Sequence, residues 1–306
     1  MKEPSLFGAI EAGGTKMVCG IGDSAGGSRE MVRIETCDPN ATFSDIIAFF
    51  TSARKRNGPF AAMGIASFGP LDLDPMSPSY GQITTTPKSG WQGADLPAAL
   101  REAFGVSVAI DTDVNAAALA EAKLGAAKGC QTVAYVTVGT GIGVGLLVEG
   151  RMAHGFGHPE AGHLLLRRDP QHGDFAGVCP FHGDCLEGLA SGPAIQAAWG
   201  QSLDHLPDEH AAWGIEADYL GQLCAMLILT VAPEHIVLGG GVMTQKRLLP
   251  MIRAETRRRL AGYAERWTGD ALEARISSPG CAEPSGLVGA YLLAEMPPRA
   301  PASIMK

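Results

Sequence analysis

The sequence has 306 residues, of which 46% are hydrophobic and 18% are charged, and its formal net charge is -8. A chain of this length exceeds the size at which one hydrophobic core usually keeps growing, so we expect two domains. The composition supplies enough apolar material for real cores and excludes a largely disordered chain. The acidic balance argues against a nucleic-acid partner, because such a surface needs clustered Lys and Arg.

The lack of a recognisable targeting signal and the cysteine usage both favour a cytoplasmic protein. No apolar run reaches the roughly 20 residues that cross a bilayer, and the first residues lack the order of a signal peptide, so we expect no membrane partner. Five of the seven cysteines are scattered singly, which suits a reducing compartment and predicts no disulfide framework.

The chain opens with a predicted β-hairpin, in which apolar residues 6–11 and 17–21 flank the turn Gly13-Gly14. A Walker-type phosphate loop is excluded, because it would need different spacing and a helix directly after its glycines. The same pattern returns at residues 132–148 around a turn at 139–143. This internal repeat predicts two similar domains.

Helical and strand patterns alternate through both halves, which predicts an α/β protein. In the first half we expect strands at 61–66 and 106–110 and helices at 43–56 and 115–124. In the second half we expect helices at 217–230 and 246–261, a strand at 235–238, and a C-terminal helix at 286–293 that packs back onto the first domain.

The two glycine turns carry the first functional signal. Glycine lets backbone N–H groups approach an anion closely, so both turns could form phosphate-binding concavities, although either alone could simply turn a hairpin. A dinucleotide-binding fingerprint is excluded, because Val144 and Leu146 stand where it requires Gly or Ala.

Asp113 follows an apolar strand and precedes an alanine-rich helix. A carboxylate at such a junction either caps the helix or acts in chemistry. In phosphoryl transfer, one carboxylate must orient the attacking hydroxyl and accept its proton, and Asp113 fits that role.

A metal site is predicted by Cys179, His182 and Cys185, which are spaced Cys-x-x-His-x-x-Cys, with His163 as a fourth ligand. Two thiolates and two imidazoles form a tetrahedral structural zinc site. A catalytic zinc is disfavoured, because four protein ligands leave no position for water. Glu160 and Glu187 flank this site, and they are either ordinary surface acids or acceptors for sugar hydroxyls.

Six motifs together resemble the ROK family of sugar kinases, with the closest likeness to bacterial fructokinases. The motifs occur in the family's order along nearly the whole chain: Glu11-Ala-Gly-Gly-Thr-Lys16, Asp111-Thr-Asp-Val-Asn115, Gly139-Thr-Gly-Ile-Gly143, Glu160-Ala-Gly-His163, Cys179-Pro-Phe-His-Gly-Asp-Cys-Leu-Glu187 and Leu238-Gly-Gly-Gly-Val242. The likeness to fructokinases rests on Thr86-Pro-Lys-Ser-Gly-Trp91, on Glu11 and on His182 as third zinc ligand.

This resemblance implies a fold of two actin-like, ribonuclease H-like ATPase lobes with a central cleft and a zinc-binding loop. We expect a small lobe at 1–112 plus 283–306 and a large lobe at 113–282. The implied reaction is ATP-dependent phosphorylation of a hexose, most consistent with D-fructose to D-fructose 6-phosphate, with Mg²⁺ accompanying ATP and a structural Zn²⁺. A homodimer is also implied.

The resemblance further assigns roles to individual residues. Asp113 would be the general base. Sugar-binding residues would be Thr112, Asp113, Glu160, His163 and Glu187. ATP-binding residues would be Gly13, Gly14, Thr15, Lys16, Gly139, Thr140, Gly141, Pro193, Gly239, Gly240 and Gly241. Zinc ligands would be His163, Cys179, His182 and Cys185.

Two departures from the family pattern leave the sugar open. Much of the family has Asp where this chain has Glu11 and Asn where it has Thr112, so glucose, mannose and an N-acetylated hexose remain alternatives. The family also contains sugar-responsive repressors, but their helix-turn-helix domain has no room before the first predicted strand. A zinc-dependent hydrolase is a third alternative, which would need an open metal position.

Overall fold

The computed structural model describes residues 5–25 and 27–297. Contacts among Cα atoms divide the chain into two compact units: unit 1 comprises Met1–Gly125, Met152–Pro159 and Cys281–Lys306, and unit 2 comprises Ala126–Arg151 and Glu160–Gly280. The lobe boundaries expected from the sequence stay a prediction, because a unit defined by contacts need not be one that moves independently.

Unit 1 is built on a five-stranded mixed sheet with the order β3-β2-β1-β4-β5. Its strands are β1 (Phe7–Ala12), β2 (Lys16–Gly22), β3 (Ser28–Glu35), β4 (Ala62–Ser67) and β5 (Ser107–Thr112). The predicted hairpin is confirmed, since β1 and β2 pair antiparallel with Ala12 opposite Met17. β4 and β5 continue the sheet in parallel with β1.

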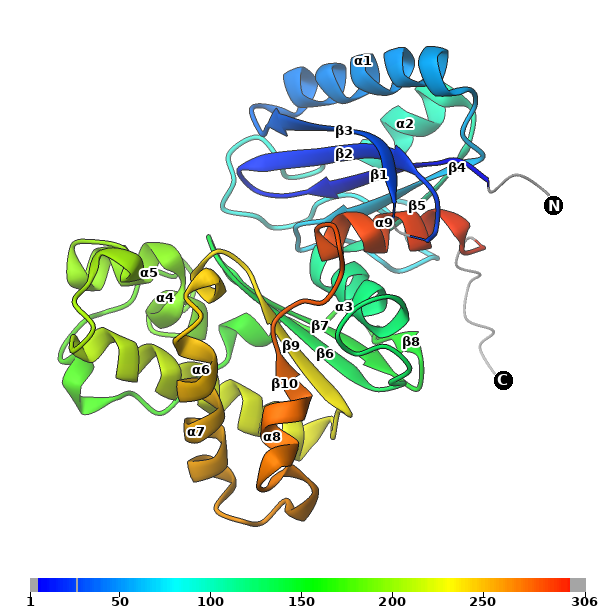
Figure 1. The fold of residues 1–306 in the computed structure, drawn as a ribbon. Helices are drawn as coiled ribbons and strands as arrows, with labels where there is room; N and C mark the ends of the chain where they lie inside the picture. The colour runs from blue at the N-terminus through cyan, green and yellow to red at the C-terminus, as the bar shows by residue number, and fades with distance from the viewer. Residues whose placement is uncertain (1–4, 26, 298–306) are drawn as a thin grey trace. The chain divides into compact units, whose positions relative to one another are not determined.

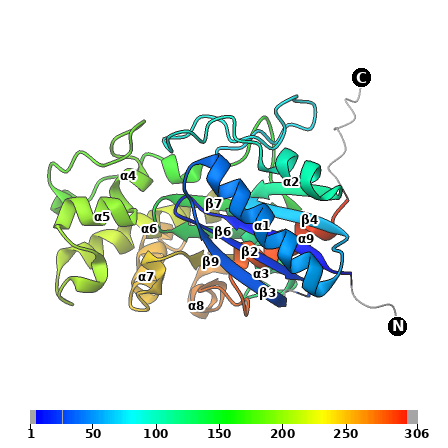
Figure 2. The same ribbon diagram turned by 90° about the horizontal axis from the view of Figure 1, so that it is seen from above.

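Four helices cover this sheet. They are α1 (Pro39–Asn57), α2 (Leu96–Phe104), α3 (Asp113–Lys123) and α9 (Ser285–Glu295). α1 and α2 lie on one face, whereas α9 lies on the other with α3 packed against it (Figure 1). Figure 2 shows α1 lying over the sheet, where it contacts β2 and β3. The helix expected at 43–56 begins earlier, at Pro39, because the Asp38 carboxylate accepts a hydrogen bond from the Ala41 N–H and proline favours a helix start.

The second sheet repeats the topology of the first. Its order is β10-β9-β6-β7-β8, formed by β6 (Val133–Val138), β7 (Ile142–Val148), β8 (Arg151–Met152), β9 (His235–Gly239) and β10 (Ile276–Ser277). β6 and β7 form an antiparallel hairpin, β9 joins β6 in parallel, and β10 joins β9 in parallel. The hairpin-first repeat predicted from the sequence is therefore confirmed at the level of strand order.

The helices of unit 2 are α4 (Leu186–Ala190), α5 (Gly192–Trp199), α6 (Ala211–Thr230), α7 (Leu248–Leu260) and α8 (Asp270–Arg275). The long helix α6 packs along α7, and both views show the pair side by side (Figures 1 and 2). Two short 3₁₀ turns matter below, η1 (Ala161–His163) and η2 (Pro170–His172). Among residues 5–25 and 27–297, no helix has the length and apolar character needed to span a bilayer.

Unit 1 depends on a close approach between α9 and β4. A Cβ placed on Gly64 of β4 would overlap the Ala290 carbonyl oxygen and lie 2.8 Å from the Ala294 nitrogen, both of them backbone atoms of α9. Backbone atoms of a packed helix cannot yield as a flexible side chain can.

Gly64→Ala should therefore lower the free energy of unfolding by about 3 kcal/mol, because the methyl group forces α9 away from the sheet. Gly214→Ala is the matched control: Gly214 lies on the exposed side of α6 with no atom within 4 Å of an added Cβ. That variant should gain roughly 0.5–1 kcal/mol from helix propensity. Urea denaturation of both variants measures the difference, and equal stability would contradict the close-packing account.

Candidate functional site

Asp113 is the first residue of α3, and the structure separates its role from helix capping. The N-cap is Thr112, whose hydroxyl oxygen accepts a hydrogen bond from the Asn115 N–H at 3.1 Å. The half-buried Asp113 carboxylate accepts from the adjacent Val114 N–H at 2.9 Å. Because Thr112 already caps the helix, the carboxylate of Asp113 is not needed for that purpose, which favours a chemical role.

A buried carboxylate that sequence reasoning missed lies two residues earlier. Asp111 is fully buried, and its Oδ1 accepts from the Thr112 N–H at 2.8 Å and from Asn115 Nδ2 at 2.9 Å. Its Oδ2 lies 2.8 Å from His154 Nε2. These contacts fix the junction between β5 and α3, so Asp111, Asn115 and His154 position the backbone that carries Asp113.

His158 belongs to the same segment of unit 1 as His154. Its Nε2 accepts a hydrogen bond from the Leu71 N–H at 3.0 Å, and burial lowers the pKa of this imidazole. Both observations describe a neutral ring that anchors the chain just before Glu160. No metalloprotease-type helix runs through Pro159, since the next regular element is the short turn η1.

The first glycine turn joins β1 to β2 in unit 1. The Gly13 N–H donates to the Lys16 carbonyl at 3.0 Å, and no heavy atom lies within 4 Å of a Cβ added at Gly14. Lys88, from the motif at 86–91, donates from Nζ to the Gly14 carbonyl at 2.6 Å. With Lys16 exposed beside it, the turn carries two lysine charges, which suit phosphate oxygens.

In unit 2 the structure brings together three glycine segments that were predicted to bind ATP. The Gly192 N–H donates to the Gly139 carbonyl at 2.8 Å, so the start of α5, with Pro193, meets the β6–β7 turn. A Cβ on Gly139 would lie 3.7 Å from the Gly241 nitrogen. Gly240 has φ of +92° and lies against the Val138 backbone, where a side chain would not fit. This gathering of backbone groups and a helix start favours an anionic ligand.

Two carboxylates lie beside the same turn. Glu187 of α4 accepts a hydrogen bond from the Ile142 N–H at 2.9 Å, and it lies 2.5 Å from where a Cβ on Gly141 would stand. Burial, followed by the charge of Glu187, raises the pKa of Glu160 to about 7. A carboxyl group poised near neutrality is typical of ligand-binding and catalytic sites.

The four predicted zinc ligands converge in unit 2. The ligand atoms of His163, Cys179, His182 and Cys185 all lie within 4.8 Å of one another. His163 Nδ1 is 3.7 Å from Cys179 Sγ and 3.5 Å from Cys185 Sγ, and His182 Nδ1 is 3.7 Å from Cys179 Sγ. Usual zinc bond lengths place tetrahedral sulfur and nitrogen ligands about 3.6 Å apart. The donor set therefore fits a zinc ion.

The charge of this cluster depends on whether a cation is bound. Burial and the neighbouring Cys179 raise the pKa of Cys185 to about 11, so without a cation the thiol would keep its proton. A zinc ion would hold both sulfurs as thiolates, and two thiolates would balance its charge.

Comparison with known proteins agrees with these motifs. The model of the ROK family matches residues 7–296. The chain is 44% identical to a protein named fructokinase from Zymomonas mobilis, covering 95% of this chain and 97% of that protein. It is 41% identical to a protein named fructokinase from Pediococcus pentosaceus, covering 95% and 98%.

A solved structure has the same fold. A ROK family glucokinase from Streptomyces griseus, in complex with glucose and AMPPNP, is 25% identical, covers 95% of this chain and 99% of that one, and superposes with a TM-score of 0.71. The family match covers nearly all of the chain, and the two curated relatives exceed 40% identity over almost their whole length. The chain therefore belongs to the ROK family.

Proposed function

We propose that this chain is an ATP-dependent hexose kinase that converts D-fructose to D-fructose 6-phosphate. The observation that carries the reaction type is Asp113, a half-buried carboxylate at a helix start that Thr112 already caps. Relatives named fructokinase, at 41–44% identity over 95% of the chain, support fructose as the sugar. Glucose, mannose and N-acetylated hexoses are the alternatives.

In unit 1, Asp113 orients the attacking hydroxyl and accepts its proton as the bond to phosphorus forms. The turn at Gly13 and Gly14, with Thr15 and Lys16, binds phosphate oxygens through backbone N–H groups and charge. Mg²⁺ bound with ATP supplies positive charge at the phosphates. Thr112 is 3% exposed and its hydroxyl caps α3, so its contact with sugar stays a prediction.

In unit 2, Glu160, His163 and Glu187 bind sugar hydroxyls, while the segments at Gly139–Gly141, Pro193 and Gly239–Gly241 bind the nucleotide. Carboxylates accept hydrogen bonds from two hydroxyls at once, which makes them selective for a pattern of hydroxyl groups. The homodimer and the cytoplasmic location expected from the sequence also stay predictions.

We further propose that the Cys₂His₂ cluster holds a structural zinc ion. Its four protein ligands leave no open coordination position, so the ion orders the loop instead of activating water. That loop also carries Glu187, two residues after Cys185, so metal binding orders a proposed sugar ligand.

Asp113→Asn should reduce kcat by at least about a thousandfold, because the amide cannot accept the hydroxyl proton, while the Kd for fructose changes little. Asp45→Asn, on the exposed side of α1, is the control and should keep full activity. ADP release is measured with Mg-ATP against fructose, mannose, glucose and N-acetylated hexoses. Near-normal turnover by Asp113→Asn would refute the base assignment, and a preference for another sugar would refute fructose.

Sugar affinity should increase with pH. Because the pKa of Glu160 is raised to about 7, its carboxyl is mostly protonated at pH 6 and mostly ionised at pH 8. If the ionised form binds the sugar, the Kd for fructose should fall about tenfold over that interval. Calorimetric titration without ATP measures it.

Glu160→Gln should weaken binding and remove this pH dependence, whereas Glu102→Gln, on the exposed surface of α2, should retain it. A wild-type Kd that is flat between pH 6 and 8 would contradict the prediction.

Cys179→Ser should lose zinc and bind fructose more weakly, because the loop loses one of its four ligands. Cys130→Ser is the matched control, since Cys130 is half-buried in unit 2 and is not part of the cluster. Zinc content is measured by mass spectrometry and fructose affinity by calorimetry. A zinc-free Cys179→Ser protein with normal fructose affinity would rule out a loop-ordering metal.

A further inference from the structure

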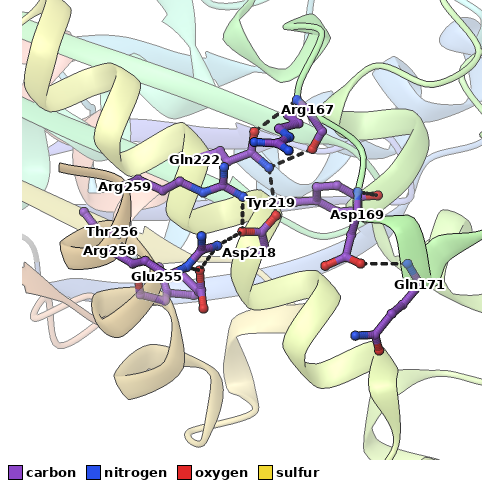
Figure 3. A network of polar contacts seen from close by, with 11 residues as sticks. Arg167, Asp169, Gln171, Asp218, Tyr219, Gln222, Glu255, Thr256, Arg258 and Arg259 are labelled. Carbon is purple, nitrogen blue, oxygen red and sulfur yellow. Dashed lines mark hydrogen bonds and ion pairs between the residues drawn. The ribbon is translucent and has the colours of Figure 1, made fainter. Parts of the chain in front are cut away.

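Unit 2 contains a cavity lined by charged residues. None of them belongs to the proposed sugar, ATP or zinc sites. The volume of the cavity is about 200 Å³, and its lining residues come from residues 167–170, at the last of which η2 begins, from α6 and from α7 (Figure 3). The lining residues are Arg167, Arg168, Asp169, Pro170, Asp218, Arg258 and Arg259. Four guanidinium groups and two carboxylates line it, and two further carboxylates, Asp184 and Glu255, pair with Arg168 and Arg258.

Asp218 lies at the centre of the network, and it is shared between two cations. Its Oδ1 accepts from Arg258 Nη2 at 2.8 Å and also from Arg259 Nη2, while its Oδ2 accepts from Gln222 Nε2 at 2.9 Å. The Asp218 side chain is only 7% exposed. Arg258 also pairs with Glu255, so two carboxylates balance these two guanidinium charges.

Two of the four arginines use their N–H donors in hydrogen bonds with other parts of the chain. Arg168 donates to Asp184 Oδ2 at 3.1 Å and to the carbonyls of Gly173 and Phe175. Arg258 also pairs with Glu255. The charges of these two side chains are therefore balanced by carboxylates, and their donors are already used.

Arg167 and Arg259 supply the unused donors. Gln222 fixes the backbone of Arg167, accepting from its N–H at 3.0 Å and donating to its carbonyl at 2.9 Å (Figure 3), whereas the Arg167 side chain is exposed. Within residues 5–25 and 27–297, the Arg167 guanidinium makes no ion pair. The Nε of Arg259 is buried without a hydrogen-bond acceptor among the same residues.

We propose that this cavity binds a small phosphate dianion, either inorganic phosphate or the phosphate group of a phosphorylated sugar. Guanidinium groups bind phosphate oxygens through paired, charge-assisted hydrogen bonds, which neutral ligands do not offer. The cavity is smaller than the roughly 300–1,000 Å³ of pockets that take drug-sized ligands, which also favours a compact anion.

The test is calorimetric titration of inorganic phosphate into the full chain, saturated with Mg²⁺ and a non-hydrolysable ATP analogue so that nucleotide phosphates occupy their own site. We expect one phosphate per chain. Arg167→Gln and Arg259→Gln should each weaken binding about tenfold, through loss of charge-assisted hydrogen bonds. Arg257→Gln is the matched control, because Arg257 lies on α7 two residues before Arg259 but contacts Gly269 and Glu273, outside the cavity. Phosphate binding by this variant should be unchanged.

A second titration separates the two sources of phosphate. If fructose 6-phosphate binds more tightly than inorganic phosphate, and its affinity falls in the same two variants, the ligand is a sugar phosphate. If inorganic phosphate binds more tightly, the ligand is inorganic phosphate. Arg167→Gln should melt at the wild-type temperature, since its guanidinium holds no ion pair in the described chain. Phosphate binding that is equal in Arg167→Gln, Arg259→Gln and Arg257→Gln, or that is absent from the wild-type chain, would overturn the proposal.

Discussion

Direct contact between backbones, which only glycine allows, holds unit 1 together. α9 comes from the end of the chain, yet it lies against β4 at Gly64 and against the α3 carbonyl of Ala116 at Gly289. At Gly286 the same helix meets the Glu11 side chain. A side chain at any of these positions would separate α9 from its neighbours, and α3, which begins with Asp113, would lose the surface that supports it.

Two carboxylates, buried Asp111 and exposed Glu160, show how the surroundings decide what an acid does. Asp111 is enclosed by donors, since a backbone N–H, an asparagine amide and an imidazole all face its oxygens. Glu160 instead lies near a second carboxylate, and burial raises its pKa to about 7. Oδ2 of Asp111 contacts His154 as an ion pair but makes no hydrogen bond in the described chain. A carboxylate held by partners from the fold itself stabilises that fold, whereas one near another negative charge gains most when hydroxyl donors of a ligand arrive. Asp111 is therefore structural, and Glu160 is suited to binding.

The sequence predicted the features that depend on short separations along the chain. The two hairpins follow from apolar runs around glycines, and three of the four predicted metal ligands lie within one loop, Cys179 to Cys185. The predicted starts of the helices were less accurate. α1 begins directly after its N-cap Asp38 and α3 directly after its N-cap Thr112, and both caps precede the apolar pattern of the helix. Capping contacts depend on one side chain, which hydrophobic periodicity does not report.

Contacts between distant segments could not be predicted from any local pattern. His154 reaches Asp111, and Lys88 reaches Gly14, only because separate strands and loops are folded together. These contacts also distinguish the two glycine turns, which look equivalent in sequence. The first has lysines beside it, whereas in the second Glu187 lies against Gly141 and bonds to Ile142. Within the proposed nucleotide site, the Glu187 carboxylate would repel a phosphate beside Gly141, which favours the groups at Gly139, at the start of α5 and at Gly241 for contact with the phosphates.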